Sequence, residues 1–574
     1  MDYMERYNEW LNNPYFDEET KEELLSIKND EKEIEDRFFK ELEFGTGGLR
    51  GVIGAGTNRM NKYIVRKATQ GLANYILNSV DKAKEKGVVI AFDSRYRSPE
   101  FAKEAALVMN GNEIKAYLFE SLRTTPELSF AVRELGCAAG IVITASHNPP
   151  EYNGYKVYGE DGGQLVPRYA NKVIEEIRKI DDFSKVKYIE EAEALNKGLL
   201  NIIGEEIDKK YIDSVKSLSL RKDLVKEMKD FKIVYTPLHG TGAMPVKRVL
   251  KEIGFENVIV VPEQEVPDSN FSTVKSPNPE EHDAFELAIS LAEKENADVI
   301  IGTDPDCDRV GVVIKDKDGV YQVLTGNQTG ALLVDYILSS METIPENSVI
   351  IKTIVTSELG KAVAEHYGVE TIDTLTGFKF IGEKIKEFEE KRDKNFLFGY
   401  EESYGYLAGT FVRDKDGVVS AMLIAEMAAY YKSKGMSLLD ALKGIYKKFG
   451  YYKEDLKSIK LEGKEGIEKI GRIMEQLRNN PPLEIGELKV EVLRDYLERK
   501  ARYILKDREE PVSLPKSNVL HFTLDDGSWF AVRPSGTEPK IKIYFSAVAE
   551  WEKEAQLKLK MIKDFVLNKI DEIE

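Results

Sequence analysis

Five short runs of apolar, mostly β-branched residues recur along the chain. A loop rich in Gly, Pro or Asp follows such a run, and an amphipathic helical stretch follows the loop. The runs are Val88–Phe92, Gly140–Ile143, Lys232–Tyr235, Asp298–Ile301 and Ser348–Ile351. Continuous apolar runs, unlike alternating ones, are typical of strands that are covered on both faces. We therefore expect α/β units with parallel or mixed sheets, whose functional sites lie in the loops that follow the strands.

The two ends of the chain show other patterns. The first forty or so residues are rich in Glu and Lys with helical spacing, as in Glu18–Leu25, and predict surface helices. The last hundred or so residues place charged helical stretches around two strand-like blocks, His521–Leu524 and Ile541–Tyr544. We expect a separate α+β domain there, and the length of 574 residues leaves room for about four domains in all.

Composition limits the class of partner and the compartment. The formal net charge is −18, from 100 acidic and 82 basic residues, so the average surface repels nucleic acid and anionic membranes. Two cysteines, Cys137 and Cys307, are too few for a disulfide framework. No signal peptide is recognisable, and no apolar run approaches the ~18 residues of a membrane span. We expect a cytoplasmic protein without a nucleic-acid or membrane partner; the sequence does not indicate the oligomeric state.

The run that ends at Ile143 leads into the string Thr144-Ala145-Ser146-His147-Asn148-Pro149-Pro150-Glu151-Tyr152-Asn153-Gly154-Tyr155-Lys156. Its prolines and glycine predict a sharp loop that presents the Ser146 hydroxyl beside the imidazole of His147. Such a serine can be a nucleophile, or it can cap backbone groups of a turn. A hydrolase triad fits poorly, because no Gly-x-Ser-x-Gly elbow is present and His147 is poorly placed to act as base for its own neighbour.

The run that ends at Ile301 leads into an acidic loop, Gly302-Thr303-Asp304-Pro305-Asp306-Cys307-Asp308-Arg309-Val310-Gly311. Carboxylates at alternate positions, Asp304, Asp306 and Asp308, can converge on one hard cation, and oxygen ligands of this kind suit Mg²⁺. A calcium EF-hand would need Gly and Glu where Arg309 and Lys315 stand. Cys307 departs from the motif of the haloacid dehalogenase phosphatases. A solvated acidic turn stays as an alternative, although clustered like charges are unfavourable without a cation.

The segment Gly399–Tyr406 suits a sugar ring. The carboxylate of Glu401 and the hydroxyl of Ser403 can hold adjacent sugar hydroxyls, while the neighbouring aromatic residues cover a ring face. Paired glutamates such as Glu401 and Glu402 are also common on solvated surfaces, so this segment is informative only together with the other loops.

The segment Ala531–Lys540 suits a phosphate group. Arg533 offers a two-pronged donor, and Ser535 and Thr537 offer hydroxyls. Gly536 allows backbone N–H groups to approach an oxyanion closely. An ordinary turn formed by proline and glycine explains the same residues, and both interpretations stay open for this segment alone.

Motifs for nucleotide binding are missing from the sequence. The glycine-rich stretch Gly45–Gly51 has Arg50 where the third glycine of a dinucleotide-binding motif would stand. The two Gly-Lys pairs continue with Ala362 and Glu465, so no Walker A motif exists. The sequence therefore does not imply ATP or NAD as a cofactor.

Taken together, the loops resemble the α-D-phosphohexomutase superfamily, which includes phosphoglucomutases, phosphomannomutases and phosphopentomutases. Four blocks stand in the expected order: a serine loop (Thr144–Lys156), a metal loop (Asp304–Arg309), a sugar loop (Glu401–Ser403) and a phosphate loop (Arg533–Thr537). The resemblance implies an α/β protein with three similar mixed-sheet α/β domains and a C-terminal α+β domain around a central cleft. The expected domains, each with one of these loops, are residues 1–205, 206–322, 323–455 and 456–574.

The resemblance also implies roles for individual residues. A phosphate on Ser146 would join Asp304, Asp306 and Asp308 around Mg²⁺. The catalytic candidates are Ser146 and His147, together with Lys156 as the proton-transfer residue and Arg50 near the transferred phosphate. The substrate-binding candidates are Arg309, Thr376, Gly377, Lys379, Glu401, Ser403, Arg533, Ser535, Gly536 and Thr537. Some members carry a histidine two residues after the sugar-loop serine, where this chain has Gly405, so the resemblance does not supply a second acid/base from that loop.

The implied function is the interconversion of a hexose 1-phosphate and a hexose 6-phosphate. Glucose is the expected sugar, because Gly45–Gly51 and Thr236–Gly240 resemble the phosphoglucomutase and phosphopentomutase branch. Glucose 1,6-bisphosphate would be the intermediate and activator. Mannose or pentose phosphates are alternative substrates, and a sugar-phosphate phosphatase or a non-catalytic sugar-phosphate sensor is an alternative function. His239 is expected to be a hydrogen-bonded core residue.

Overall fold

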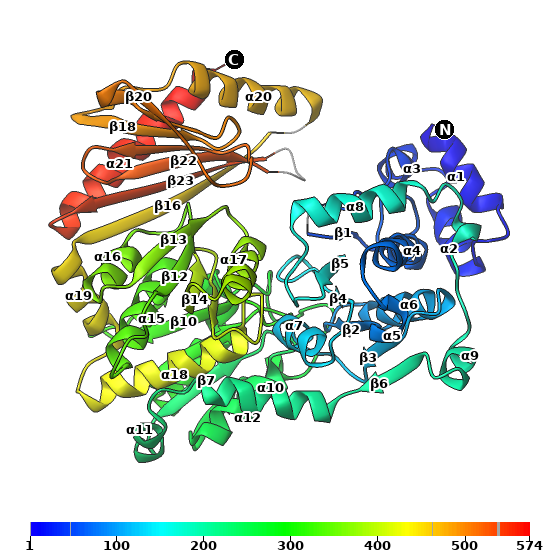
Figure 1. Ribbon diagram of the computed structural model, residues 1–574, viewed down its shortest axis with the longest axis horizontal. Helices are drawn as coiled ribbons and strands as arrows, with labels where there is room; N and C mark the ends of the chain where they lie inside the picture. Colours follow the sequence, from blue (N-terminus) through cyan, green and yellow to red (C-terminus); the bar gives the residue numbers. More distant parts are fainter. Residues whose placement is uncertain (1, 46, 462, 536–539, 574) are drawn as a thin grey trace. The chain divides into compact units, whose positions relative to one another are not determined.

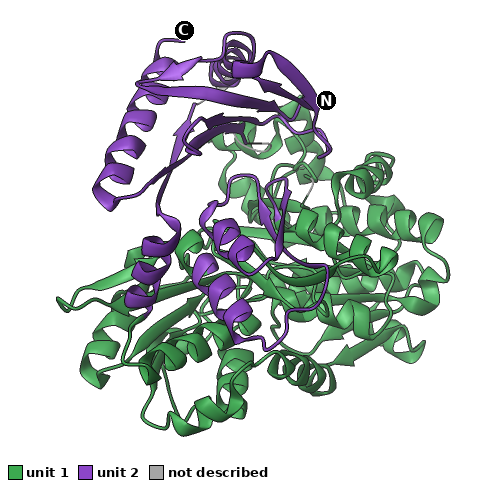
Figure 2. Ribbon diagram, turned by 60° about the vertical axis from the view of Figure 1, so that its left-hand side comes forward, with its two compact units in different colours: residues 1–329, 378–437 green, residues 330–377, 438–574 purple. Residues whose placement is uncertain are grey.

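A computed structural model of the chain describes residues 2–45, 47–461, 463–535 and 540–573. The chain, whose helices and strands are labelled in Figure 1, forms two compact units. One is built from residues 1–329 and 378–437 and the other from residues 330–377 and 438–574 (Figure 2). The first passage between the units lies inside helix α15 (Gly326–Ser340). We call them unit 1 and unit 2 and describe each by itself.

The first sheet of unit 1 has six strands in the order β1-β5-β4-β2-β3-β6. Its strands are β1 (Leu49–Val52), β2 (Val88–Phe92), β3 (Ala116–Phe119), β4 (Ala139–Ile143), β5 (Tyr152–Gly159) and β6 (Leu200–Ile203). Strands β2, β3, β4 and β6 run parallel, whereas β5 is antiparallel to both β4 and β1. Every residue of β2 and β4 is buried. This confirms the prediction of a mixed sheet whose strands are covered on both faces.

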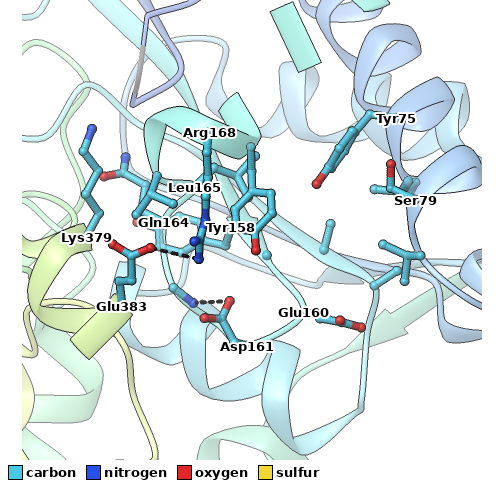
Figure 3. Close-up of a pocket in the computed structure, with 18 of the residues that line it drawn as sticks. Tyr75, Ser79, Tyr158, Glu160, Asp161, Gln164, Leu165, Arg168, Lys379 and Glu383 are labelled. Atoms are coloured by element: carbon cyan, nitrogen blue, oxygen red, sulfur yellow. Dashed lines mark hydrogen bonds and ion pairs between the residues drawn. The ribbon is translucent and has the colours of Figure 1, made fainter. Parts of the chain in front are cut away.

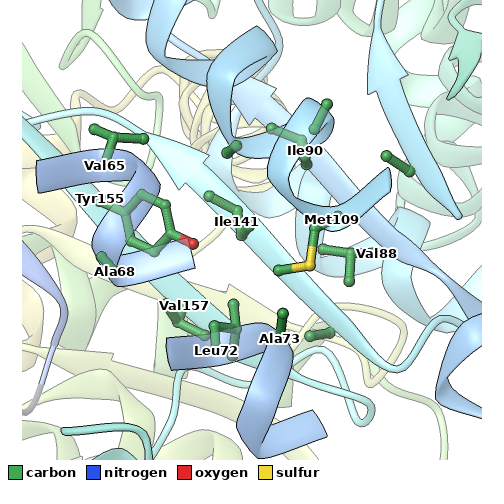
Figure 4. Packing of buried hydrophobic residues seen from close by; sticks show 14 of the residues in the cluster. Val65, Ala68, Leu72, Ala73, Val88, Ile90, Met109, Ile141, Tyr155 and Val157 are labelled. Atoms are coloured by element: carbon green, nitrogen blue, oxygen red, sulfur yellow. The ribbon is translucent and has the colours of Figure 1, made fainter. Parts of the chain in front are cut away.

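Two long helices, α4 (Lys62–Ser79) and α6 (Ser98–Gly111), contribute to the core of this sheet. Figure 4 shows Val65, Ala68 and Leu72 of α4 packed with Ile141 and Val157 of the sheet. Because these apolar side chains recur at three- and four-residue spacing on α4, they form one face that can be buried against the strands. The sheet is therefore a rigid support for the loops at its edge.

Three helices precede this sheet: α1 (Tyr3–Asn12), α2 (Glu18–Ser26) and α3 (Glu31–Phe38). Each begins after an aspartate whose side chain accepts a hydrogen bond from the third helical N–H. The predicted helices are confirmed, but they are more than a charged surface. They bury a core in which the rings of Trp10 and Phe16 stack with their centroids 4.2 Å apart.

The second sheet of unit 1 has the order β11-β10-β9-β7-β8. Its strands are β7 (Lys232–Thr236), β8 (Asn257–Val260), β9 (Val299–Thr303), β10 (Val310–Lys315) and β11 (Tyr321–Leu324). Strands β7, β8 and β9 are parallel, and β10 is antiparallel to β9 and β11. The acidic loop connects β9 to β10, so the adjacent strands fix both of its ends.

The rest of unit 1 includes a hairpin of β14 (Asn395–Glu401) and β15 (Gly405–Ala408). Two long helices are α17 (Phe378–Lys391) and α18 (Gly417–Ser433), and the side chain of Asp416 caps the start of α18. The remaining helices are α5 (Ala83–Lys86), α7 (Thr125–Glu134), α8 (Pro167–Arg178), α9 (Glu191–Asn196), α10 (Glu205–Ser217), α11 (Lys222–Glu227), α12 (Ala243–Ile253), α13 (Pro262–Glu265) and α14 (Glu286–Glu295), with 3-10 turns at Phe183–Lys185 and His282–Phe285.

Unit 2 contains the parallel strands β12 (Ser348–Thr353) and β13 (Glu370–Thr374), with helices α16 (Leu359–His366) and α19 (Leu438–Phe449). It continues into a C-terminal antiparallel sheet of order β16-β23-β22-β21-β18-β19-β20, with β17 paired to β18. The strands are β16 (Tyr451–Lys460), β17 (Glu484–Ile485), β18 (Leu488–Asp495), β19 (Lys500–Tyr503), β20 (Arg508–Pro511), β21 (Leu520–Leu524), β22 (Trp529–Pro534) and β23 (Lys540–Ala549).

Helices α20 (Gly463–Asn479) and α21 (Glu552–Asp571) share an apolar core with the C-terminal sheet, which also has a 3-10 turn at Ile504–Lys506. The predicted C-terminal α+β domain is thereby confirmed. Within the described ranges, we find no helix with the length and hydropathy needed to cross a membrane.

Candidate active site

The serine loop leaves β4 at Ile143 and turns back into β5. Ser146 adopts a left-handed backbone conformation, with φ of 54°, and its N–H donates to Thr144 Oγ1 at 2.8 Å. The N–H of Asn148 donates to the carbonyl of Ala145, which closes the turn. The side chain of Ser146 is held at the edge of the sheet and is only 3% exposed. The loop therefore has one defined conformation, in which the Ser146 hydroxyl is fixed.

The metal loop is folded around its own first carboxylate. Asp304 Oδ1 accepts the backbone N–H groups of Asp308 and Arg309, each at 3.0 Å. Cys307 has a φ of 57° and donates its N–H to the carbonyl of Asp304. These contacts turn the chain so that one carboxylate oxygen of each of Asp304, Asp306 and Asp308 lies within 4.8 Å of the others. All three side chains are buried.

The structure brings the serine and metal loops together. Ser146 Oγ donates a hydrogen bond to Asp304 Oδ2 at 2.7 Å. Lys156, in β5, places its Nζ 2.6 Å from Asp306 Oδ2 and 3.2 Å from Asp308 Oδ2. A nucleophilic hydroxyl, three carboxylates and an amine thus meet in one buried place, although they come from segments far apart in the sequence.

The electrostatics of the group follow from its burial. Burial would lower the pKa of Lys156, but Asp306 and Asp308 together raise it, so the amine stays protonated. Burial and the neighbouring carboxylates raise the pKa of Asp304. Burial would also raise the pKa of Asp306, but the positive charge and the hydrogen bond of Lys156 outweigh it and lower that pKa. The site therefore holds unequal carboxylates, of which Asp304, the one in contact with Ser146, has the highest affinity for a proton.

The neighbouring imidazole differs from our expectation. His147 Nδ1 lies 3.2 Å from Ser146 Oγ, within hydrogen-bonding reach, so the residue is not poorly placed for its neighbour. The left-handed turn at Ser146 makes this approach possible. Burial, Arg309 and Arg50 lower the pKa of His147 well below its usual value. The ring is therefore neutral, and the same burial and positive charges disfavour its protonation.

Arg309, Glu401 and Ser403 lie near the metal loop in unit 1. Arg309 is ion-paired with Glu280, and its Nε is 4.0 Å from Asp308. Glu401 ends β14, and burial, opposed by Lys415, raises the pKa of its carboxyl group to about 7. Ser403 follows in the hairpin turn, and its hydroxyl lowers the pKa of Glu401 against the effect of burial. The Glu401 carboxyl group could accept a hydrogen bond from a sugar hydroxyl, and its charge would change with pH near 7.

Arg50 also lies beside the serine loop. It belongs to β1, where it pairs with Gly154 of β5. Its Nη1 donates to the side chain of Asn148 at 3.0 Å. An arginine so close to Ser146 can contact an anion there.

The predicted specificity segment crosses the boundary between the units: Thr376 and Gly377 belong to unit 2 and Lys379 to unit 1. Gly377 has a φ of 115°, which favours glycine. Lys379, on α17, lines a cavity of about 220 Å³ that Figure 3 shows. Across this cavity Arg168 forms an ion pair of 2.9 Å with Glu383. The residues that line it do not include those of the serine or metal loops.

The phosphate-loop candidates lie in unit 2. Arg533 is half-buried in β22 and pairs with Lys542 of β23. The N–H of Ser535 donates to the carbonyl of Lys540 at 2.7 Å. Gly536 and Thr537 lie outside the described residues. The roles proposed for these four residues therefore stay predictions.

Two residues that sequence reasoning did not assign belong to the site. Lys415 Nζ is 3.2 Å from Asp308 Oδ2, and Thr125 Oγ1 donates to Asp306 Oδ2 at 2.8 Å. Lys415 belongs to the charged string Arg413–Gly417, which gives no sign of this contact because its aspartate partner is distant in the chain. Thr125 is the first residue of α7, directly after the capping Thr124, and no sequence signal points to its contact with Asp306.

His239 has a structural role, as expected. Its Nδ1 is 3.0 Å from the carbonyl of Val266, and its Nε2 is 2.8 Å from Thr273 Oγ1. The ring is buried and both nitrogens are hydrogen-bonded. This leaves no ring nitrogen available for chemistry.

The aspartates have the properties of a metal site. Asp306 Oδ1 and Asp308 Oδ1 are buried, and neither has a hydrogen-bond partner among the described residues. Unpaired buried carboxylate oxygens are unfavourable without a cation. Their oxygens, with that of Asp304, form a donor set that suits a hard divalent ion such as Mg²⁺.

Comparisons with known proteins cover most of the chain. Family models of the phosphoglucomutase/phosphomannomutase α/β/α domains I, II and III match residues 41–184, 209–319 and 325–449, and the model of the C-terminal domain matches residues 485–563. A phosphoglucomutase of Staphylococcus haemolyticus is 42% identical, over 89% of this chain and 91% of the relative. One of Staphylococcus aureus is 41% identical, over 90% of this chain and 92% of the relative.

Solved structures share the fold. A putative phosphomannomutase from Thermus thermophilus is 22% identical, with a TM-score of 0.66 and coverage of 92% of this chain and 99% of that one. Parafusin, a phosphoglucomutase from Paramecium, is 19% identical, with a TM-score of 0.68 and coverage of 93% and 95%. The four domain models and the identity to curated phosphoglucomutases establish that this chain belongs to the phosphoglucomutase/phosphomannomutase family of the α-D-phosphohexomutase superfamily.

Proposed function

We propose that this chain interconverts α-D-glucose 1-phosphate and glucose 6-phosphate through a phosphorylated Ser146 and a glucose 1,6-bisphosphate intermediate. The observation that carries the proposal is the hydrogen bond of 2.7 Å between Ser146 Oγ and Asp304, at the edge of the three-aspartate group. Family membership supports the mutase reaction, and the staphylococcal relatives named phosphoglucomutase support glucose as the sugar.

Asp304, Asp306 and Asp308 would hold Mg²⁺, together with a phosphate oxygen on Ser146. When bound, the ion withdraws charge from the phosphoryl group and stabilises the transition state of its transfer. The unpaired oxygens of Asp306 and Asp308 support this assignment. Arg50 and Arg309 would add positive charge around the transferred group.

In the first half-reaction the 6-hydroxyl oxygen of glucose 1-phosphate attacks the phosphorus on Ser146. The bond between phosphorus and Oγ breaks, the sugar hydroxyl loses its proton, and Oγ gains one. Lys156 is protonated, since Asp306 and Asp308 raise its pKa; it can supply that proton and then take up the one that the sugar hydroxyl loses. The product is the bisphosphate, and the serine hydroxyl is again free to donate to Asp304.

In the second half-reaction Ser146 Oγ attacks the phosphorus of the 1-phosphate group. The bond between that phosphorus and the C1 oxygen breaks, the C1 oxygen takes up a proton, and glucose 6-phosphate leaves. Lys156 can supply the proton that the C1 oxygen gains and then take up the one that Oγ loses. His147 Nδ1 lies 3.2 Å from Oγ and can hold the hydroxyl in place. Glu401 and Ser403 would hold sugar hydroxyls, and Thr376, Gly377 and Lys379 would select the sugar. Arg533, Ser535, Gly536 and Thr537 would bind the phosphate that is not transferred.

The test is a coupled assay of one preparation with glucose, mannose, ribose and deoxyribose 1-phosphates, with phosphate release measured in parallel. We expect the highest kcat/KM with glucose 1-phosphate and little phosphate release per turnover. Ser146→Ala should abolish isomerisation, whereas Ser290→Ala, an exposed serine of α14, should not change it. Phosphate release that equals substrate consumption would instead identify a phosphatase, and normal turnover by Ser146→Ala would refute the proposal.

A further inference from the structure

Arg95 lies directly behind the serine loop and is fully buried. Its Nη2 donates to the carbonyl oxygens of Ser146, at 2.6 Å, and Asn148. Its Nη1 donates to the carbonyls of Pro149 and Tyr152, at 2.7 and 3.1 Å. One guanidinium group therefore holds four main-chain carbonyls of the loop that carries the nucleophile.

Two further groups fix the guanidinium itself. Asp93, next to the end of β2, places Oδ2 3.3 Å from Arg95 Nε. Its Oδ1 accepts a hydrogen bond from the main-chain N–H of Arg95 at 2.9 Å. The hydroxyl of Ser98 donates to the same Oδ1 at 2.7 Å. The ring of Phe271 lies over the guanidinium, 4.9 Å from its carbon to the ring centroid. The arginine thus has one orientation, which its surroundings determine.

The same packing continues to the metal loop. The ring of Phe271 lies 6.4 Å from that of His239, measured between centroids. Next to His239, Gly240 lies so close to Pro305 that a Cβ on it would be 2.5 Å from the Pro305 Cα. Thr241 donates both its N–H and its hydroxyl to the carbonyl of Pro305, at 2.8 and 2.9 Å. Arg95, Phe271 and His239 form a continuous buried brace between the two loops.

We propose that Arg95 is a positioning residue, which holds Ser146 against the metal loop so that the phosphoryl group passes to the sugar rather than to water. The inference rests on the proposed role of Ser146 as phosphoryl carrier. The left-handed conformation of Ser146 is one that non-glycine residues rarely adopt, so it needs support from its surroundings. Lysine could not give that support, because it offers three donors from a single point instead of a planar fork.

A displaced loop would change the fate of the phosphoryl group. If a water oxygen attacks the phosphorus on Ser146, the bond between phosphorus and Oγ breaks and inorganic phosphate leaves, while the water gives up a proton and Oγ takes one up. A misplacement on the order of 1 Å can slow an aligned transfer about 100-fold, whereas attack by mobile water depends less on alignment. The ratio of phosphate release to isomerisation therefore reports how well the loop is positioned.

The experiment compares Arg95→Lys with the wild type. Arg59→Lys is the matched control, since Arg59 is also buried, donates to main-chain carbonyls and pairs with Asp36 at 2.6 Å, but lies among the N-terminal helices. We expect Arg95→Lys to lower kcat at least tenfold with KM within about twofold, and to raise phosphate release per isomerisation at least fivefold. Phe271→Leu should also lower kcat and raise phosphate release per isomerisation, each by a smaller factor. Arg59→Lys should leave the ratio unchanged.

The ratio does not depend on the fraction of folded enzyme, so a purely structural defect would lower both rates and leave the ratio constant. That result, or a wild-type ratio and kcat in Arg95→Lys, would overturn the inference. If Arg95→Lys does not fold, the ratio measured with Phe271→Leu decides in the same way. If the wild type neither isomerises glucose 1-phosphate nor incorporates phosphate at Ser146, the proposed function fails instead.

Discussion

Lys156 and Lys415 lie among the three aspartates of the metal loop and offset part of their charge. Lys156 Nζ is 2.6 Å from Asp306, and Lys415 Nζ is 3.2 Å from Asp308. Buried like charges repel strongly because the protein interior screens them weakly. The two amines alone leave one oxygen of Asp306 and one of Asp308 without a hydrogen-bond partner among the described residues. A divalent cation would complete this balance of charge.

The substitution Asp308→Asn tests the cation site. It removes one charge from the donor set, and we expect Mg²⁺ affinity to fall on the order of 100-fold or more, since changes even outside the ligand shell cost 10–100-fold in comparable sites. The measurement is calorimetric titration with Mg²⁺, together with the thermal shift that Mg²⁺ causes. The control is Asp283→Asn, which changes an exposed aspartate that pairs with Lys275, and it should bind Mg²⁺ with the affinity of the wild type. Equal affinities for all three proteins would contradict a metal site here.

The raised pKa of Glu401, about 7, predicts a pH dependence of sugar binding. Only the ionised carboxylate accepts hydrogen bonds on both oxygens. Because burial raises the pKa, the group is mostly protonated at pH 6 and ionised at pH 8. We expect kcat/KM for glucose 1-phosphate to rise through this range in the wild type. Glu401→Gln should be less active and lack that part of the rise; an identical pH profile in the variant would assign the rise to another group, such as the substrate phosphate.

At the scale of elements, the central strands were predictable from the sequence. The run Val88–Phe92 coincides with β2, and Asp298–Ile301 overlaps β9. Both consist of residues that are buried on each face of a sheet, so the apolar signal is continuous and local. The positions of Ser146 and Asp304 directly after strands followed from the same pattern.

The contacts that complete the site were not predictable. Arg95 follows a strand in the string Asp93-Ser94-Arg95, whose Asp and Ser favour a turn but do not indicate a ligand. Its four acceptors are carbonyls of a distant loop. Lys415 likewise meets Asp308 only through the packing of two separate segments. A main-chain carbonyl leaves no mark on the sequence, so an arginine that binds such groups resembles any other arginine.

The connection between β7 and the metal loop predicts the effect of Gly240→Ala. The added Cβ would lie 2.5 Å from Pro305 Cα and 2.6 Å from its carbonyl oxygen, so the metal loop must move. We expect a loss of about 1–3 kcal/mol in stability, and weaker Mg²⁺ binding by calorimetry. Gly444→Ala, in α19, meets open space and should leave both unchanged or slightly stabilise the helix. Unaltered Mg²⁺ affinity in Gly240→Ala would show that this contact does not shape the metal loop.

Strand β16 carries a buried carboxyl group that should make unit 2 sensitive to pH. Glu454 Oε1 is buried without a hydrogen-bond partner among the described residues, and burial raises the pKa of this side chain to about 7. The folded state therefore binds the proton more tightly than the unfolded chain does. The stability that this group contributes is complete below its unfolded pKa and is lost as pH rises through about 7.

Glu454→Gln removes that dependence. Between pH 5 and pH 8 we expect the free energy of unfolding of the variant to rise by up to about 3 kcal/mol relative to that of the wild type, because the amide never ionises. Thermal unfolding midpoints at the two pH values give the comparison. Glu509→Gln, an exposed glutamate of β20 in the same sheet, is the control and should show no such gain. A constant difference between Glu454→Gln and the wild type at both pH values would rule out this carboxyl as the source.

For the whole molecule, the two units differ in how the chain builds them. Unit 1 uses two long stretches of chain, and its core extends around two mixed sheets. The C-terminal part of unit 2 is continuous: the apolar cluster of its sheet and helices α20 and α21 lies between Ile470 and Ile570. A continuous segment that closes its own core meets the usual criterion for a domain.

We therefore predict that residues 450–574 fold when expressed alone. The segment is roughly 125 residues long, within the usual size of a domain, and its strands pair with one another from β16 to β23. We expect a cooperative thermal transition and a circular dichroism spectrum with both strand and helix content. Phe522→Ala should abolish the transition, because it removes a buried ring that stacks on Phe530 at 4.3 Å and such changes cost about 3–5 kcal/mol. A broad, non-cooperative transition in the unmodified segment would mean that its core depends on the remainder of the chain.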